Sequence, residues 1–140
     1  RFTSAGVPQG SDFQVNSYTT GDQGPPAVAV DDAGAFVVVW ASRYQDGSNY
    51  GVFGQRFSPA GLPAGSEFRV NTHTTGSQLF SAVAADGTGN FVMAWSSGGQ
   101  DGSGYGVFGQ RYGSATSIFA DGFEAASACA WSAAVGGGCP

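Results

Sequence analysis

Residues 50–56 read YGVFGQR, and residues 105–111 repeat the same seven letters. Outward from this pair, residues 2–56 align without a gap with residues 57–111, and 33 of the 55 aligned positions are identical. Repeats of about 20 to 50 residues are typical of solenoids and propellers, in which each unit buries its faces against its neighbours. The chain is therefore expected to contain two similar units, followed by residues 113–140, which break the repeat.

Each unit contains four stretches with the composition of β-strands. In the first unit and the start of the second they are residues 26–30, 35–42, 51–58 and 66–71. The first two are continuous apolar runs, typical of strands covered on both faces, and the third alternates as a half-buried strand does. Turns with Gly34 or Gly89 at a position that favours positive φ join the first two stretches of each unit. Residues 12–16 (DFQVN) also alternate, and they correspond to the fourth strand of an incomplete preceding unit.

Four strands in about 50 residues match one blade of a β-propeller. The expected fold is all-β, with two four-stranded antiparallel propeller-like blades in residues 1–112, incomplete alone, and a short C-terminal tail in residues 113–140. Arg1 and Phe2 correspond to the end of a third strand, so the chain begins in mid-unit, as though cut from a longer array or matured by cleavage. The N-terminal strand could then complete the last sheet, which is how propellers protect their edges.

Two blades cannot close a ring, because known propellers use about four to eight. Three or four copies would close a ring of six or eight blades, and a pairing that does not close would give an open filament. The chain is therefore expected to form a homo-oligomer or polymer. The side chains expected to take part in assembly are Phe13, Val15, Ile118 and Phe119.

Composition excludes several classes of partner. With 10 acidic and 5 basic residues the net charge is −5, so a nucleic-acid partner is not expected. No run approaches the roughly 20 apolar residues of a membrane-spanning helix. No lysine occurs, which excludes a Schiff-base enzyme and a Walker-type phosphate loop. Cys129 and Cys139 have a spacing that allows a small disulfide, which would place the protein in an oxidising, extracellular compartment.

The motifs of the repeat resemble those of a known class of proteins. The stretches 10–16 (GSDFQVN), 26–29 (PAVA), 34–40 (GAFVVVW), 45–48 (QDGS) and 51–57 (GVFGQRF) are similar to tandem repeats of large secreted bacterial proteins, among them adhesin-like and calcium-binding-repeat proteins. The resemblance implies a propeller-like fold and an extracellular setting, either secreted or associated with the cell surface. It carries over no catalytic residue.

The tail has a resemblance of its own. Residues 118–124 (IFADGFE), followed by residues 130–132 (AWS), resemble a C-terminal segment of secreted proteins of some proteobacteria, which implies secretion. Residues 116–119 could replace the missing fourth strand, and the alanine-rich residues 124–134 could form a short helix. A capping terminus and a docking element are both open for this tail.

Two sets of repeated side chains are candidate ligand sites. The aromatic set, which could stack on glycans between blades, is Trp40, Trp95, Tyr50 and Tyr105. The loop set, whose oxygens could bind calcium, is Asp46, Ser48, Asp101 and Ser103. Each has a favoured structural alternative, because a Trp that ends an apolar strand is usually core and an Asp-Gly pair is usually a turn. No cofactor is therefore expected, with calcium as the cation that these loops suit.

The remaining candidates also favour a structural role. Arg1, Arg56 and Arg111 recur in phase and could bind an anion or a sugar acid, but a ladder of charge-assisted hydrogen bonds to Asp or to carbonyls is the favoured interpretation. His73 is matched by Tyr18 in the first copy, and no Gly-x-Ser-x-Gly motif occurs. The chain is therefore not expected to be an enzyme.

These observations lead to one functional hypothesis and two alternatives. The first is a non-enzymatic extracellular structural or adhesive repeat protein that self-assembles by strand completion between copies. The second is a carbohydrate-binding lectin that forms an oligomeric propeller. The third is an inert fragment of a larger adhesin. Buried, paired ends would favour the first, and an exposed Trp or Tyr in a cleft repeated in each blade would favour the second.

Overall fold

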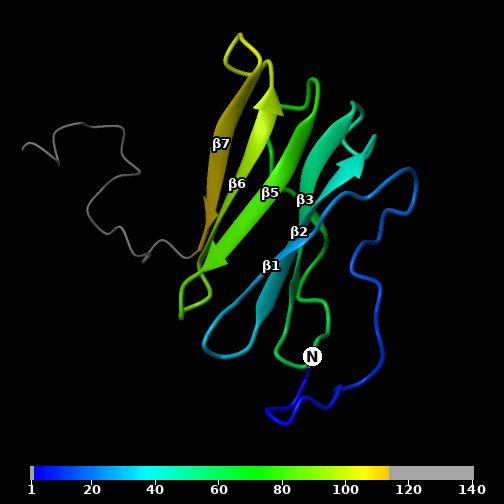
Figure 1. Ribbon diagram of the computed structural model, residues 1–140, viewed down its shortest axis with the longest axis vertical. Helices are drawn as coiled ribbons and strands as arrows, with labels where there is room; N and C mark the ends of the chain where they lie inside the picture. The colour runs from blue at the N-terminus through cyan, green and yellow to red at the C-terminus, as the bar shows by residue number, and fades with distance from the viewer. Residues whose placement is uncertain (1, 114–140) are drawn as a thin grey trace, which may run out of the picture.

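The computed structural model describes residues 2–113, and its secondary structure is entirely β (Figure 1). It contains two antiparallel sheets, which do not close into a ring, and no helix in the described range, so the all-β expectation is confirmed. Within that range there is accordingly no helix of the length and apolarity that a membrane crossing requires. The predicted disulfide, the predicted helix and the assembly residues Ile118 and Phe119 lie outside the described residues.

The first sheet has the strand order β1-β2-β3-β4. Its strands are β1 (Ala27–Val30), β2 (Phe36–Arg43), β3 (Tyr50–Phe57) and β4 (Phe68–Arg69). Each neighbouring pair is antiparallel, and β2 and β3 pair over their whole length. These strands confirm the four stretches that the sequence predicts, although β4 is shorter than the predicted 66–71.

The second sheet has the order β5-β6-β7. Its strands are β5 (Gln78–Ala85), β6 (Phe91–Gly98) and β7 (Tyr105–Tyr112). β5 is longer than its counterpart β1 because Phe80 and Ser81 stand where the first copy has Pro25 and Pro26, and proline has no N–H for a strand ladder. A register shift between Leu79 and Ala82 marks a bulge there.

The second sheet differs from the expectation of four strands. In residues 2–113 it has three, and residues 12–16 form no strand. The reason is their position: this segment lies against the far side of the first sheet, where Val15 packs among buried side chains, and not beside β7. The expected completion of the last sheet by the chain's own N-terminus is therefore wrong for this structure.

The predicted turns are confirmed. Gly34 has φ of 83° and Gly89 has φ of 86°, in the left-handed region that glycine tolerates. In the first turn the Asp31 carboxylate accepts a hydrogen bond from the Ala35 N–H at 2.9 Å. The Asp31 N–H donates to the Ala35 carbonyl at 2.9 Å, which closes the hairpin between β1 and β2.

The two sheets pack face to face, and each sheet presents two different faces. We call the face of the first sheet that carries Val37, Val39 and Val52 its valine face, and the opposite face, with Val38, Trp40 and Phe53, its tryptophan face. At the offset of 55 the valine face of the second sheet carries Val92, Ala94 and Val107, and its tryptophan face carries Met93, Trp95 and Phe108. The main core lies between the valine face of the first sheet and the tryptophan face of the second.

The tryptophan face of the first sheet is covered by the N-terminal segment, which runs along the outside of that sheet (Figure 1). Val15 packs on the cluster formed by Val38, Trp40, Phe53 and Phe57, and the ring of Phe13 lies 5.4 Å from that of Phe57. β2 and β3 of the first sheet are thus buried on both faces, as the apolar run of β2 predicts, whereas β1 is open on its outer side.

A matched pair of substitutions tests this packing. Val52 has no exposed surface and its repeat counterpart Val107 is 80% exposed. We expect Val52→Ala to lower the free energy of unfolding by about 2 kcal/mol, from lost burial plus a residual cavity, and Val107→Ala to change it by less than about 0.5 kcal/mol. Urea denaturation of dilute protein measures both. Equal losses for the two variants would contradict the placement of the core.

Candidate functional site

Within residues 2–113, no second sheet covers the valine face of the second sheet as one covers the same face of the first. Val37 and Val52 are 3% and 0% exposed beneath the second sheet. Their counterparts Val92 and Val107 are 46% and 80% exposed. Since the residue types are identical, the difference comes only from the missing neighbour. An open apolar face of this kind is typical of an interaction site.

At the opposite end of the molecule, the outer side of β1 is also exposed. Val28 and Val30 lie on the outer side of β1 and are 64% and 62% exposed. Their counterparts in β5, Val83 and Ala85, are half-buried because the first sheet packs on them. On the tryptophan face of the second sheet, β5 is therefore covered by the first sheet, whereas on the same face of the first sheet the N-terminal segment covers β2 and β3 and leaves β1 open.

The sheet edges repeat this asymmetry. β3 is covered on its outer edge by β4, where the Val70 N–H donates to the Val52 carbonyl at 2.8 Å and the Val52 N–H donates to Oδ1 of Asn71 at 2.7 Å. β7 pairs with β6 in the same register as β3 with β2, so the N–H and carbonyl of Val107 point away from β6. No strand in residues 2–113 pairs with that edge.

Asn71 joins the two sheets through its side-chain amide. Besides accepting from the Val52 N–H, it donates from Nδ2 to the His73 carbonyl at 2.8 Å and to Oε1 of Gln78 at 3.3 Å. Gln78 belongs to β5 and donates in turn to Oγ of Ser97 at 3.3 Å. One buried amide therefore bonds β3 of the first sheet and β5 of the second.

The N-terminal segment is placed on the first sheet as residues 68–71 are placed on the second. Phe68 lies 5.2 Å from Tyr112, which stacks on Phe91 at 5.2 Å. One repeat earlier, Phe13 lies 5.4 Å from Phe57, which stacks on Phe36 at 4.9 Å. The segment around Phe13 therefore lies on the first sheet as the β4 residue Phe68 lies on the second. Unlike β4, it has no strand equivalent to β3 beside it in residues 2–113.

Glu67 fastens this segment to the rest of the chain. Its Oε2 accepts hydrogen bonds from the N–H of Ser17 at 2.7 Å and from the Ser17 hydroxyl at 3.0 Å. Its other carboxylate oxygen accepts from the side-chain amide of Gln45. Sequence reasoning missed this anchor, because nothing in the repeat shows that residues 50 positions apart meet.

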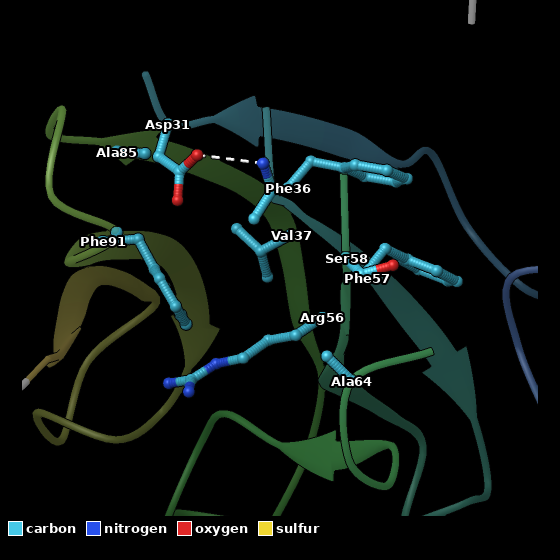
Figure 2. A pocket seen from close by; sticks show the side chains of 11 residues that line it. Asp31, Phe36, Val37, Arg56, Phe57, Ser58, Ala64, Ala85 and Phe91 are labelled. Atoms are coloured by element: carbon cyan, nitrogen blue, oxygen red, sulfur yellow. Dashed lines mark hydrogen bonds between the residues drawn. The ribbon is translucent and has the colours of Figure 1, made fainter. Parts of the chain in front are cut away.

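The sequence-predicted arginine ladder takes a different form. Arg56 extends from β3 with its guanidinium 4.6 Å from the centre of the Phe91 ring, at the wall of a pocket of about 140 Å³ (Figure 2). In residues 2–113 the Arg56 side chain forms no ion pair and no hydrogen bond, so at this position a cation–π contact across the two sheets stands in place of the expected charge-assisted hydrogen bond. Arg1 lies outside the described residues. Burial raises the pKa of the neighbouring Tyr112 phenol, and the Arg56 charge opposes that rise.

The aromatic candidates do not form one repeated surface. Trp40 and Trp95 are buried, at 3% and 5% exposure, so neither ring is open to a sugar. Tyr50 is half-buried, with the Arg43 guanidinium 5.9 Å from its ring, whereas Tyr105 is exposed. The four side chains thus belong to the interior and to the ends of β3 and β7.

The loop candidates act as turn residues. Oδ1 of Asp46 accepts from the Ser48 N–H at 3.1 Å, and Oδ1 of Asp101 accepts from the Ser103 N–H at 3.2 Å. Across residues 2–113 no three His, Cys, Asp or Glu side chains are grouped so as to hold a metal ion. The second carboxylate oxygen of Asp46 accepts from Nδ2 of Asn71 at 3.4 Å, which ties this loop to the joint between the sheets.

Comparisons with known proteins add no functional assignment. No protein-family model, curated protein or solved structure matches this chain. The candidate site is therefore defined by the chain's own geometry. It consists of an open valine face with the β7 edge, which no strand of residues 2–113 pairs, at one end, and an open β1 surface with the N-terminal segment at the other.

The turn that joins β5 to β6 should make stability depend on pH. The side chain of Asn90, with Thr88 and the local backbone, holds the pKa of the Asp86 carboxyl at about 2, below its ordinary 3.8. Because the folded-state pKa is depressed, the stabilisation is present above pH 3.8 and is lost as the pH falls toward 2. We expect the melting temperature of Asp86→Asn to fall less steeply over that window than that of the wild type. Parallel curves from a pH series of thermal melts would contradict this.

Proposed function

We propose that this chain is a non-enzymatic structural repeat protein that assembles with further copies of itself. The valine face and β7 edge of one copy receive β1 and the N-terminal segment of the next. The observation that carries the proposal is the reciprocal exposure of matched residues: Val107 and Val28 are open, whereas their counterparts Val52 and Val83 are covered by the other repeat.

The joint between copies would repeat the joint inside the chain. Within one chain, the valine face of the first sheet packs on the tryptophan face of the second, so the two contacting surfaces differ. A contact of this kind between copies is heterologous, because each copy uses one surface as donor and another as acceptor. Each added copy then presents the same open pair of surfaces as the last.

Two physical terms favour such assembly. Covering an exposed valine side chain contributes about 1.5 kcal/mol or more, and Val28, Val30, Val92 and Val107 are all available for it. An unpaired strand edge also presents a row of free N–H and carbonyl groups, which is a template for another chain. β7 has eight residues, long enough to accept the whole segment 13–16.

The setting of this assembly is part of the same proposal. The resemblance of the repeat to secreted, adhesin-like proteins supports an extracellular structural or adhesive role. The burial of Trp40 and Trp95 makes the alternative of glycan binding by stacked tryptophans less favourable. An assembly role needs no ligand and no catalytic residue.

Complementation between two variants tests the proposal. Val107→Arg places a charge on one surface, and Val28→Arg places a charge on the other; both side chains are exposed in the single chain. We expect wild-type chains to associate, each variant alone to remain a single chain, and an equimolar mixture to form dimers that grow no further. Light scattering across a concentration series measures these masses.

The control is Leu62→Arg. Leu62 is 66% exposed and its counterpart Val7 is 56% exposed, so this position is open in both repeats and lies outside the proposed interface. Leu62→Arg should associate as the wild type does. Wild-type protein that stays a single chain at every concentration would contradict the proposed function, and a mixture that stays monomeric would contradict a head-to-tail contact.

A further inference from the structure

Asn16 and Asn71 occupy the same position in the two repeats, and Nδ2 of each donates hydrogen bonds to equivalent acceptors. Nδ2 of Asn16 donates to the Tyr18 carbonyl at 2.8 Å and to Oε1 of Gln23 at 3.5 Å. Nδ2 of Asn71 donates to the carbonyl of His73, the counterpart of Tyr18, and to Gln78, the counterpart of Gln23. The two amides therefore have the same orientation within their repeats.

The other side of the two amides differs. Oδ1 of Asn71 accepts the Val52 N–H at 2.7 Å, and Nδ2 reaches Oδ2 of Asp46 at 3.4 Å. In the described part of the chain no donor bonds Oδ1 of Asn16, and no carboxylate accepts from its Nδ2. The strand and loop that would supply both groups belong to a preceding blade.

The matching groups are present at the far end of the molecule. Val107 of β7 is the counterpart of Val52, and its N–H points away from β6. Asp101 is the counterpart of Asp46; its Oδ1 accepts from the Ser103 N–H, as Asp46 does with Ser48, and its Oδ2 has no partner in residues 2–113. An acceptor on Asn16 thus corresponds to a donor on Val107, and a donor on Asn16 to an acceptor on Asp101.

We infer that Asn16 of one copy clamps β7 of another copy, accepting the Val107 N–H and facing the Asp101 carboxylate. This inference rests on the proposed assembly and names the residue that fixes its register. The contact places the Val15 N–H against the Val107 carbonyl, as Val70 faces Val52 within the chain. Asn16 is preorganised for this contact, because both of its neighbours are fixed: Val15 packs on the first sheet and the Ser17 N–H is bonded to Glu67.

The clamp selects register as well as partner. β-strands that slip by one residue turn every side chain to the opposite face. A slip by two residues would keep the faces but would move Oδ1 of Asn16 away from the Val107 N–H. Only one register lets the Asn16 amide both accept from the Val107 N–H and donate to Asp101. In that register the valine face of one copy packs on β1 of the next, as the first sheet packs on β5 within a chain.

The test compares Asn16→Ala with Gln14→Ala, an exposed position in the same segment. The readouts on the full chain are the dissociation constant between copies, from light scattering, and amide hydrogen exchange at Val107. We expect Asn16→Ala to raise the dissociation constant about tenfold or more, as for loss of a buried hydrogen-bond partner. It should also leave the Val107 N–H exchanging rapidly, while Gln14→Ala behaves as the wild type.

Exchanging the two side chains, Asn at position 16 and Asp at position 101, distinguishes loss of the contact from loss of folding. Asn16→Asp keeps an acceptor for the Val107 N–H but sets a carboxylate against Asp101, so association should weaken at pH 7. Asn16→Asp also loses the bonds to Tyr18 and Gln23 within its own chain, so the measure is the gain in association that Asp101→Asn gives. Asp101→Asn removes the repulsion and supplies an amide donor, so it should strengthen association in the Asn16→Asp chain and not in the wild type. An equal effect in both backgrounds would overturn the pairing of these two residues.

The outcomes separate this inference from the proposed function. If wild-type chains associate and Val107→Arg prevents it, but Asn16→Ala changes the dissociation constant less than twofold, the clamp is wrong and the assembly stands. If wild-type chains never associate, both are wrong. A single chain in which the Val107 N–H nevertheless exchanges slowly would mean that another part of the same chain occupies the β7 edge, which also overturns the clamp.

Discussion

The buried amide of Asn71 is the interaction on which the arrangement of the two sheets depends. It satisfies the N–H of Val52 at the edge of one sheet and bonds Gln78 at the start of the next. Its exposure is only 2%, so each of these polar groups would otherwise be buried without a partner. Asn71 lies between β4 and β5 in the chain, so its hydrogen bonds link the edge of the first sheet to the first strand of the second.

From this joint follows the difference between the two faces of each sheet. The strand that follows Asn71 is β5, the first strand of the second sheet, and the second sheet meets the valine face of the first through its own tryptophan face. Small side chains contribute to this contact: Ala27 and Ala29 of β1 and Val83 and Ala85 of β5 all pack against the same core. Close approach of the backbones is the result, and dense packing of this kind is what apolar cores require.

The sequence contains enough information to predict the strands but not their partners. The 55-residue offset and the apolar runs predict β1, β2 and β3 within one or two residues, and Gly34 and Gly89 predict the turns. Residues 12–16 alternate as a strand does but form none here, because a strand exists only where another strand supplies hydrogen bonds, and that depends on tertiary structure. The contact of Arg56 with Phe91 and the bond from Ser17 to Glu67 cross between repeats, and periodicity within one repeat carries no information about either.

The equivalence of the joints within and between copies bears on the shape of the assembly. If Asn16 and Asn71 make the same contact, the rotation from one copy to the next is twice the rotation from one sheet to the next, and no second interface is needed. A heterologous contact closes into a ring only when its rotation divides a full turn, and otherwise it continues as a filament. Propellers close with about four to eight blades, which for two repeats per chain means about two to four copies. The packing of Val37 and Val52 on the second sheet sets the rotation, so the geometry inside one chain decides between ring and filament.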